Sequence, residues 1–187
     1  MTGQYKENPN WIETFTGKKV DPLRLEPNDI SLVDIAHSLS LTCRFSGHCR
    51  KFYSVADHSL LVYRIVMLET RDPMTLLAAL MHDAAEAYMV DIPRPIKYQL
   101  REVLEIERRI DGVVMSAFNI HGGDWAVVKN ADNTALAVEA KNLMRSGGTG
   151  WELPDYSHLD ILIGKTAAPR LLEQEFIDTF YMLKDSI

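Results

Sequence analysis

One stretch of the sequence places ionisable side chains among residues that belong in a protein core. It runs from Ala79 to Tyr98 and reads ALMHDAAEAYMVDIPRPIKY. His82 and Glu86 are four residues apart, so a continuous helix would bring them to one face, with Asp83 about 100° around the axis. Imidazole and carboxylate groups on a buried helix face suggest metal binding or proton transfer.

Two further ionisable residues interrupt the apolar stripes of other expected helices. His58 lies on the stripe of the helix before His82, and Asp132 lies on that of a later helix, in VVKNADNTAL. A buried carboxylate is costly unless it is paired or bound to metal. Each residue alone is more often structural than a ligand, but together they predict one divalent ion held from three helices. The predicted metal ligands are His58, His82, Asp83 and Asp132.

The predicted ligand set constrains the ion only partly. Two imidazoles and two carboxylates suit a divalent transition metal or Mn²⁺ better than Ca²⁺. Manganese, cobalt, zinc, iron and magnesium all stay open. Such an ion activates water and offsets charge on a phosphoryl oxygen.

A second set of groups close to the first suits phosphate chemistry. Glu86 could polarise the attacking water or return a proton to the leaving oxygen. Arg44, which opens RFSGHCRK, can grip a phosphate with two parallel donors. Asp91 and Lys97 follow in DIPRPIK, a segment stiffened by two prolines, and could position a sugar hydroxyl and a phosphate. For Arg94 in the same segment, a position facing solvent is an equal alternative to one facing the site.

Composition limits the classes of function. The 187 residues suit one domain, with 47% hydrophobic and 25% charged residues and a formal net charge of -6. That balance argues against a protein that coats a nucleic-acid polymer, although a small anion could still bind in a local basic pocket. No apolar run approaches the roughly 20 residues that span a bilayer. Cys43 and Cys49, with no secretion signal before them, indicate reduced thiols and a cytoplasmic protein.

The hydrophobic periodicity predicts an all-α fold with at most a small N-terminal hairpin around TGKK. Residues 1–30 form the predicted N-terminal extension, 31–144 the catalytic helices, and 145–187 a loop and a C-terminal helix. Ser31 or Asn28 could cap the first helix. The expected helices cover about 32–39, 54–68, 73–89, 98–118, 125–144 and 168–183.

The order of these residues resembles a known family. The pattern His58 … His82-Asp83 … Asp132 is similar to that of the HD-domain metal-dependent phosphohydrolases. The segments ADHSLLV, MHDAAEAYMVDIPRPIKY and VKNADNTAL look like those of bacterial 5'-deoxynucleotidases and of phage deoxyadenosine triphosphate triphosphohydrolases. The resemblance covers about residues 30–143, and the run His-Asp-x-x-Glu … Asp-x-Pro-x-Pro-x-Lys is specific.

The resemblance implies a role for each candidate residue. It implies a homo-oligomer, and it assigns the same four metal ligands that the residue types predict. Phe45 stands where these relatives commonly carry a base-stacking Trp, so base preference does not carry over. The segment TFTGKKVDPLRLEPNDI has no counterpart in the deoxynucleotidases. The other implied roles are catalysis by Glu86, sugar recognition by Asp91, and phosphate contacts from Arg44 and Lys97.

The expected function is hydrolysis of the 5' phosphate ester of a deoxynucleotide. A monophosphate would release phosphate, and a triphosphate, which could bring additional Mg²⁺, would release triphosphate or successive phosphates. Cationic residues slightly favour tolerance of the longer substrates. Cyclic-nucleotide or alarmone phosphodiesterase activity, or a non-catalytic metal-stabilised nucleotide-binding module, remain alternatives. The cationic residues are Arg44, His48, Arg50, Lys51, Arg94 and Lys97.

Overall fold

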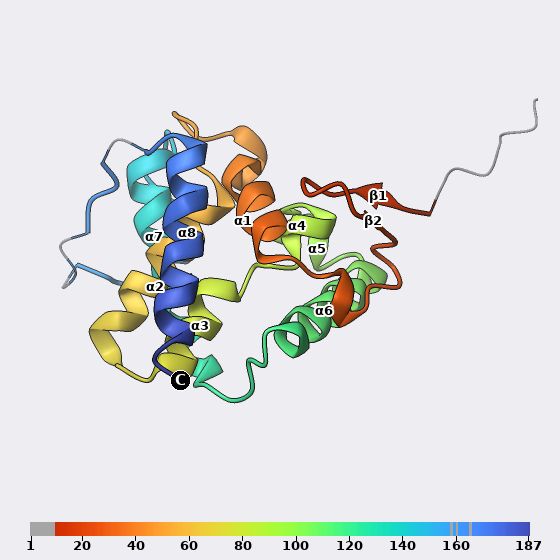
Figure 1. Ribbon diagram of the computed structural model, residues 1–187. Helices are drawn as coiled ribbons and strands as arrows, with labels where there is room; N and C mark the ends of the chain where they lie inside the picture. Colours follow the sequence, from red (N-terminus) through yellow and green to blue (C-terminus); the bar gives the residue numbers. More distant parts are fainter. Residues whose placement is uncertain (1–9, 158, 160, 165) are drawn as a thin grey trace, which may run out of the picture.

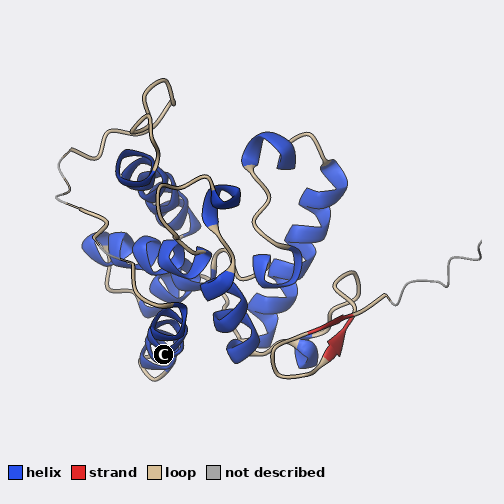
Figure 2. Cartoon of the chain, turned by 90° about the horizontal axis from the view of Figure 1, so that it is seen from above, coloured by secondary structure: helices blue, strands red, loops and turns tan. Residues whose placement is uncertain are grey.

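The computed structural model describes residues 10–157, 159, 161–164 and 166–187, and its fold is all-α with a short N-terminal hairpin, as predicted. Figure 1 shows the helices and Figure 2 the same chain from above. The helical elements are η1 (Pro27–Asp29), α1 (Leu32–Leu41), η2 (Arg44–Gly47), α2 (Val55–Glu69), α3 (Pro73–Met81), α4 (Glu86–Met89), α5 (Arg94–Lys97), α6 (Arg101–Ala117), α7 (Trp125–Leu143) and α8 (Pro169–Lys184).

Helix α2 is the centre of the fold. It packs against α1, α3, α7 and α8, and its apolar residues are buried nearly all round. Its start is fixed by a capping box in which the Ser54 hydroxyl accepts from the Asp57 amide and the Asp57 carboxylate accepts from the Ser54 amide. This central position places His58, one turn into α2, in the interior.

The hairpin is fastened to α1 at the edge of the molecule. Strands β1 (Ile12–Glu13) and β2 (Lys19–Val20) pair antiparallel around the TGKK turn. The carboxylate of Asp34 accepts hydrogen bonds from the Thr16 amide at 2.7 Å and from its hydroxyl at 2.9 Å. Ser31 caps α1, which confirms one of the two predicted capping residues.

The prediction of one helix over 73–89 is wrong. Helix α3 ends at Met81, a turn follows, and α4 begins at Glu86. Amide-to-carbonyl bonds across this turn span three residues, as in Ala84 to Met81 and Glu86 to Asp83, which tightens the backbone. His82 and Glu86 therefore do not share one face of a continuous α-helix. The turn brings both Asp83 and Glu86 toward the same pocket.

The later helices agree with prediction except near residue 98. The expected start at Tyr98 falls between the short helix α5 and helix α6, because Pro93 and Pro95 start a separate turn. Helices α7 and α8 end within about one residue of prediction. Among the described residues no helix is both long and apolar enough to cross a membrane.

Candidate metal centre and adjoining pocket

Three predicted ligands converge in the interior from separate elements. His58 comes from α2, His82 caps the end of α3, and Asp132 comes from α7. One ligand atom from each lies within 4.8 Å of those of the others. His58 and Asp132 are buried, and His82 is partly buried. This group could hold a metal ion.

Hydrogen bonds on the far side of each imidazole determine which nitrogen faces the cluster. Nδ1 of His58 lies 2.6 Å from a carboxylate oxygen of Glu139, and Nδ1 of His82 lies 2.8 Å from the carbonyl oxygen of Ala79. Both partners are acceptors, so Nδ1 of each ring carries a hydrogen; Nε2 then presents a lone pair when the ring is neutral and carries a second hydrogen when it is an imidazolium. The two Nε2 atoms are 3.3 Å apart. Lone pairs at this separation require a cation or a proton between them.

Two carboxylates surround the facing imidazoles. Oδ2 of Asp83 lies 3.3 Å from Nε2 of His82 and 3.4 Å from Nε2 of His58. Oδ1 of Asp132 lies 3.3 Å from Nε2 of His58. Asp83 falls outside the tightest three-residue group, yet it borders both imidazoles, so all four predicted ligands lie together.

The second carboxylate oxygen of Asp132, Oδ2, accepts hydrogen bonds from two basic side chains that were not among the predicted site residues. Oδ2 accepts from Arg94 at 2.8 Å and from Lys129 at 2.7 Å. These bonds leave Oδ1 directed at His58. The sequence left open whether Arg94 faces solvent or the site. Its side chain is 37% exposed, and it forms an ion pair with Asp132.

The cluster's electrostatics favour a positive charge. Burial and Arg44 both lower the pKa of His58, but Glu139 and Asp132 outweigh them and raise it to about 10. Burial raises the pKa of Asp132, but its bond to His58 and the nearby imidazolium charge hold it well below its usual range. Burial also raises the pKa of Asp83, but the neighbouring His82 imidazole outweighs burial, so the pKa of Asp83 is lowered.

Arg44 lies between the His/Asp cluster and the pocket. It is 11% exposed and lies in η2, where Nη2 donates to Glu139 at 3.2 Å. Nη1 lies 3.8 Å from Asp83 and 3.7 Å from Asp91. Burial lowers the pKa of this guanidinium, but these three carboxylates and Glu86 outweigh burial and raise it. Phe45 is not among the pocket-lining residues; its ring centroid is 6.2 Å from that of Trp151.

Glu86 and Lys97 also line the pocket. Glu86 is 3% exposed, its Oε2 has no hydrogen-bond partner in the part of the chain that the structure describes, and burial with Asp83 and Asp91 raises its pKa well above the usual value. The Lys97 ammonium is 3.6 Å from Oε1 of Glu86 and 2.5 Å from Oε1 of Glu107. The ammonium predicted to contact phosphate therefore already has two carboxylate partners.

These groups border a cavity of about 290 Å³. Its lining includes seven of the nine predicted site residues, together with Trp125 and Tyr98 at the rim. His58 lies behind it and Phe45 outside it. The seven are Arg44, His82, Asp83, Glu86, Asp91, Lys97 and Asp132.

Glu139 is a buried carboxylate beside the cluster that was not among the predicted site residues. It lies seven residues after Asp132 and therefore on the same face of α7, which the helical period could have indicated. Glu139 is fully buried and contacts both His58 and Arg44. A second missed carboxylate, Glu107, binds Lys97 from α6.

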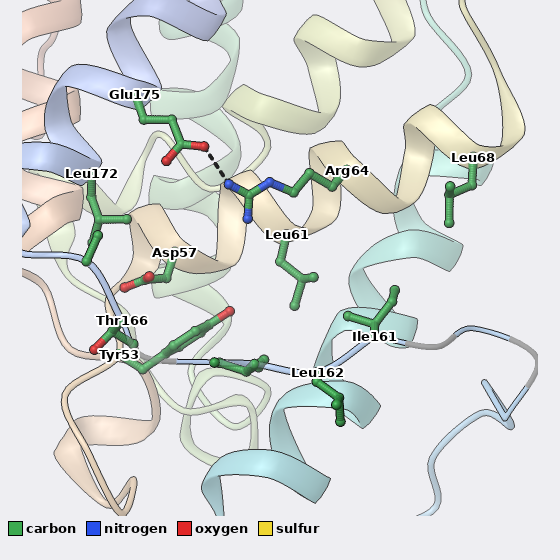
Figure 3. Close-up of a pocket in the computed structure, with 13 residues that line it drawn as sticks. Tyr53, Asp57, Leu61, Arg64, Leu68, Ile161, Leu162, Thr166, Leu172 and Glu175 are labelled. Atoms are coloured by element: carbon green, nitrogen blue, oxygen red, sulfur yellow. Dashed lines mark hydrogen bonds and ion pairs between the residues drawn. The ribbon is translucent and has the colours of Figure 1, made fainter.

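A larger cavity lies on another side of α2. It measures about 470 Å³ and is bordered by α2, α8 and residues 161–164, 166 and 167. Figure 3 shows its ion pair between Arg64 and Glu175, together with Asp57 and the ring of Tyr53. The Asp57 carboxylate already accepts hydrogen bonds from the amide and the hydroxyl of Ser54 in the capping box of α2. The described lining contains no histidine or cysteine, so we place the chemistry in the smaller pocket.

Fold and site together define an all-α protein with a buried His/Asp cluster able to hold a metal ion. The chain is 39% identical over 142 residues to the "Uncharacterized protein YfdR" of Escherichia coli (strain K12), covering 76% of this chain and 77% of that protein. It is 32% identical over 136 residues to the "Uncharacterized protein RCAP_rcc00048" of Rhodobacter capsulatus, covering 70% and 69%. The chain belongs to the family of these proteins. No family model matches it.

Proposed function

We propose that the protein is a divalent-metal-dependent hydrolase of the 5' phosphate ester of deoxynucleotides. The observation that carries the proposal is the pair of imidazole Nε2 atoms 3.3 Å apart, bordered by carboxylates and opening on a pocket with a buried arginine. The order of these residues, with its resemblance to the HD-domain phosphohydrolases, supports the same reaction.

The donor set fits one divalent ion. His58, His82 and Asp132 would hold it, with Asp83 beside them. When bound, a divalent ion there lowers the pKa of a coordinated water and offsets negative charge on a phosphoryl oxygen. Manganese, cobalt, zinc, iron and magnesium remain the candidates.

Arg44 and Lys97 are the proposed phosphate contacts. Nε of Arg44 is buried and has no hydrogen-bond partner among the described residues, so it retains a donor for an anion. Lys97 would exchange its longer contact, at 3.6 Å from Glu86, for a phosphate oxygen. Both cations lie in the pocket that borders the metal cluster.

Glu86 is the proposed proton donor and Asp91 the proposed sugar contact. Burial, together with the neighbouring carboxylates Asp83 and Asp91, raises the pKa of Glu86 and so favours its protonated form, which suits protonation of the leaving 5' oxygen. Asp91, beside Arg44, would accept from the 3'-hydroxyl of the sugar. Deoxynucleoside mono- and triphosphates would offer the same ester bond; a triphosphate could bring additional Mg²⁺. The proposed partners are small nucleotides in the cytoplasm, with no nucleic-acid polymer or membrane.

The test measures product release from a nucleotide panel. Purified protein is incubated with deoxy- and ribonucleoside mono- and triphosphates, cyclic nucleotides and an alarmone, with Mn²⁺, Co²⁺ or Mg²⁺ and with chelator. We expect metal-dependent release of phosphate or triphosphate and its loss with chelator. Glu86→Gln, prepared in parallel, controls for contaminating phosphatases.

The outcome separates the alternatives. Cleavage confined to cyclic nucleotides or the alarmone would replace the proposal with a phosphodiesterase. Tight nucleotide binding without turnover under every metal would indicate a binding module. Chelator-resistant turnover would contradict any role for the metal.

A further inference from the structure

Glu139 is a fully buried carboxylate whose two oxygens each contact a basic side chain. One oxygen contacts Nδ1 of His58 at 2.6 Å, and the other accepts from Nη2 of Arg44 at 3.2 Å. A buried charge of this kind is costly unless every partner is retained. Its position on α7 therefore constrains α2 and η2 together.

At His58, Glu139 determines the state of the ring. An ionised carboxylate only accepts hydrogen bonds, so Nδ1 must carry the hydrogen and Nε2 must face Asp132 and His82. Partners of this kind fix the orientation of metal-binding imidazoles in other proteins. Without Glu139, the ring would lose the bond that selects its tautomer.

At Arg44, Glu139 makes the shortest of the carboxylate contacts. The distance is 3.2 Å, against 3.7 Å to Asp91 and 3.8 Å to Asp83. The guanidinium is therefore anchored from behind by Glu139, with its remaining groups directed toward the pocket.

We infer that Glu139 is a positioning residue that couples the metal site to the phosphate-binding arginine. One rigid carboxylate orients both His58 and Arg44, so a change at either one reaches the other through Glu139. The inference rests on the proposed function only in treating Arg44 as a phosphate contact. Binding of metal and of orthophosphate, neither of which needs turnover, tests it.

The experiment compares Glu139→Gln and Glu139→Asp. Glu139→Asp keeps the charge but shortens the side chain, so it cannot reach both partners. We expect both variants to bind Mn²⁺ about 10–100-fold more weakly, the range for loss of a partner of a metal-binding His. At saturating Mn²⁺, orthophosphate affinity should fall about tenfold through loss of a charged hydrogen bond.

A spectroscopic readout separates positioning from net charge. In the Zn²⁺-loaded protein, ¹⁵N NMR should report hydrogen on Nδ1 of His58 and its loss or averaging in Glu139→Gln. Glu105→Gln, on the exposed side of α6, is the matched control and should change none of these quantities. Circular dichroism checks folding, and if Glu139→Gln does not fold, Glu139→Asp carries the test.

Arg44→Lys tests the coupling from the other end. The variant keeps the positive charge but loses the planar guanidinium. Glu139 should therefore be held less firmly against His58, and Mn²⁺ affinity should fall although no proposed metal ligand is substituted. Unchanged Mn²⁺ affinity in Glu139→Asp, or unchanged orthophosphate affinity when metal binding weakens, would overturn the coupling. If the binding results hold but no nucleotide is cleaved, the inference stands and the proposed reaction fails.

Discussion

Glu86 combines deep burial with an oxygen that has no partner among the described residues. We predict that Glu86→Gln keeps the metal but lowers turnover by roughly 10²–10⁴-fold, because an amide preserves the shape and cannot give up a proton. Metal content and rate are measured on the same preparation. Loss of the metal would make Glu86 a ligand, and near-normal turnover would leave it without a catalytic role.

Asp91 should influence the choice of sugar. Its carboxylate lies 3.7 Å from Arg44 on the pocket wall, beside the stiff Pro93 segment. We predict that Asp91→Ala weakens substrate binding and narrows the preference for deoxyribose over ribose. The measurement is kcat/KM for matched deoxy- and ribonucleotides. The same ratio in variant and parent would refute the role.

At the scale of elements, helices with strong apolar periodicity were predictable and the breaks between them were not. The spacing located α2, α7 and α8 because each buries one continuous apolar stripe. The break after Met81 carries no glycine or proline, since a tight turn with three-residue bonds accommodates ordinary residues. Tertiary packing, which local patterns do not encode, decides such a turn.

The site was predictable where a residue's own position looked unusual. His58 and Asp132 interrupt apolar stripes, so single helices reveal them. The partners of Glu139, His58 and Arg44, lie 81 and 95 residues away from it in the chain. The partner of Glu107, Lys97, lies 10 residues away on a different helix. Such pairings exist only once the helices are packed.

Helix α3, which leads into the His82 turn, has Asp72 as its N-cap. Oδ2 of Asp72 accepts from the amide of Thr75 at 2.8 Å and from its hydroxyl at 2.6 Å, and these bonds lower the pKa of Asp72. We predict that Asp72→Ala reduces the free energy of unfolding by about 1 kcal/mol at neutral pH. Urea unfolding measures it, with Glu105→Ala as an exposed control.

The sign of the pH dependence follows from the lowered pKa. A carboxyl whose folded pKa lies below its unfolded value contributes fully above the unfolded value and loses that contribution as pH falls through the folded one. The difference between parent and Asp72→Ala should therefore shrink toward pH 2. A difference that stays constant from neutral to acid pH would show that the carboxylate's charge is not responsible.

At the scale of the whole molecule, the proposed metal would join three parts of the chain. Its ligands come from α2, the end of α3, and α7, so an ion binds the folded state alone. We predict that Mn²⁺ at about 100 times its Kd stabilises the fold by about 2.7 kcal/mol. Thermal unfolding with metal and with chelator measures this, and His82→Ala should not respond. An equal response in His82→Ala would place the ion elsewhere.

The expected homo-oligomer remains a prediction. Helix α8 leaves Leu171, Tyr181 and Met182 more than half exposed, although no distinctive interface stripe marks the sequence. Sedimentation at micromolar concentration should give a mass above 21.2 kDa. A monomer under these conditions would refute it.

Helix α6 lies to one side of the helices around α2 (Figure 1), where it packs on η1, α4 and α5 and joins the common core through Ile110 and Val114. The proposed metal ligands come from α2, the end of α3 and α7, whereas Glu107 and Leu104 supply part of the pocket lining from α6. Leu104 and Glu107 are only partly buried, so we expect substitutions confined to them to disturb the core less than changes at Ile110 or Val114. Under the proposed function, related proteins could differ in the nucleotide they accept through changes in this wall, and exchanging these α6 residues would alter specificity while the proposed metal ligands stay constant.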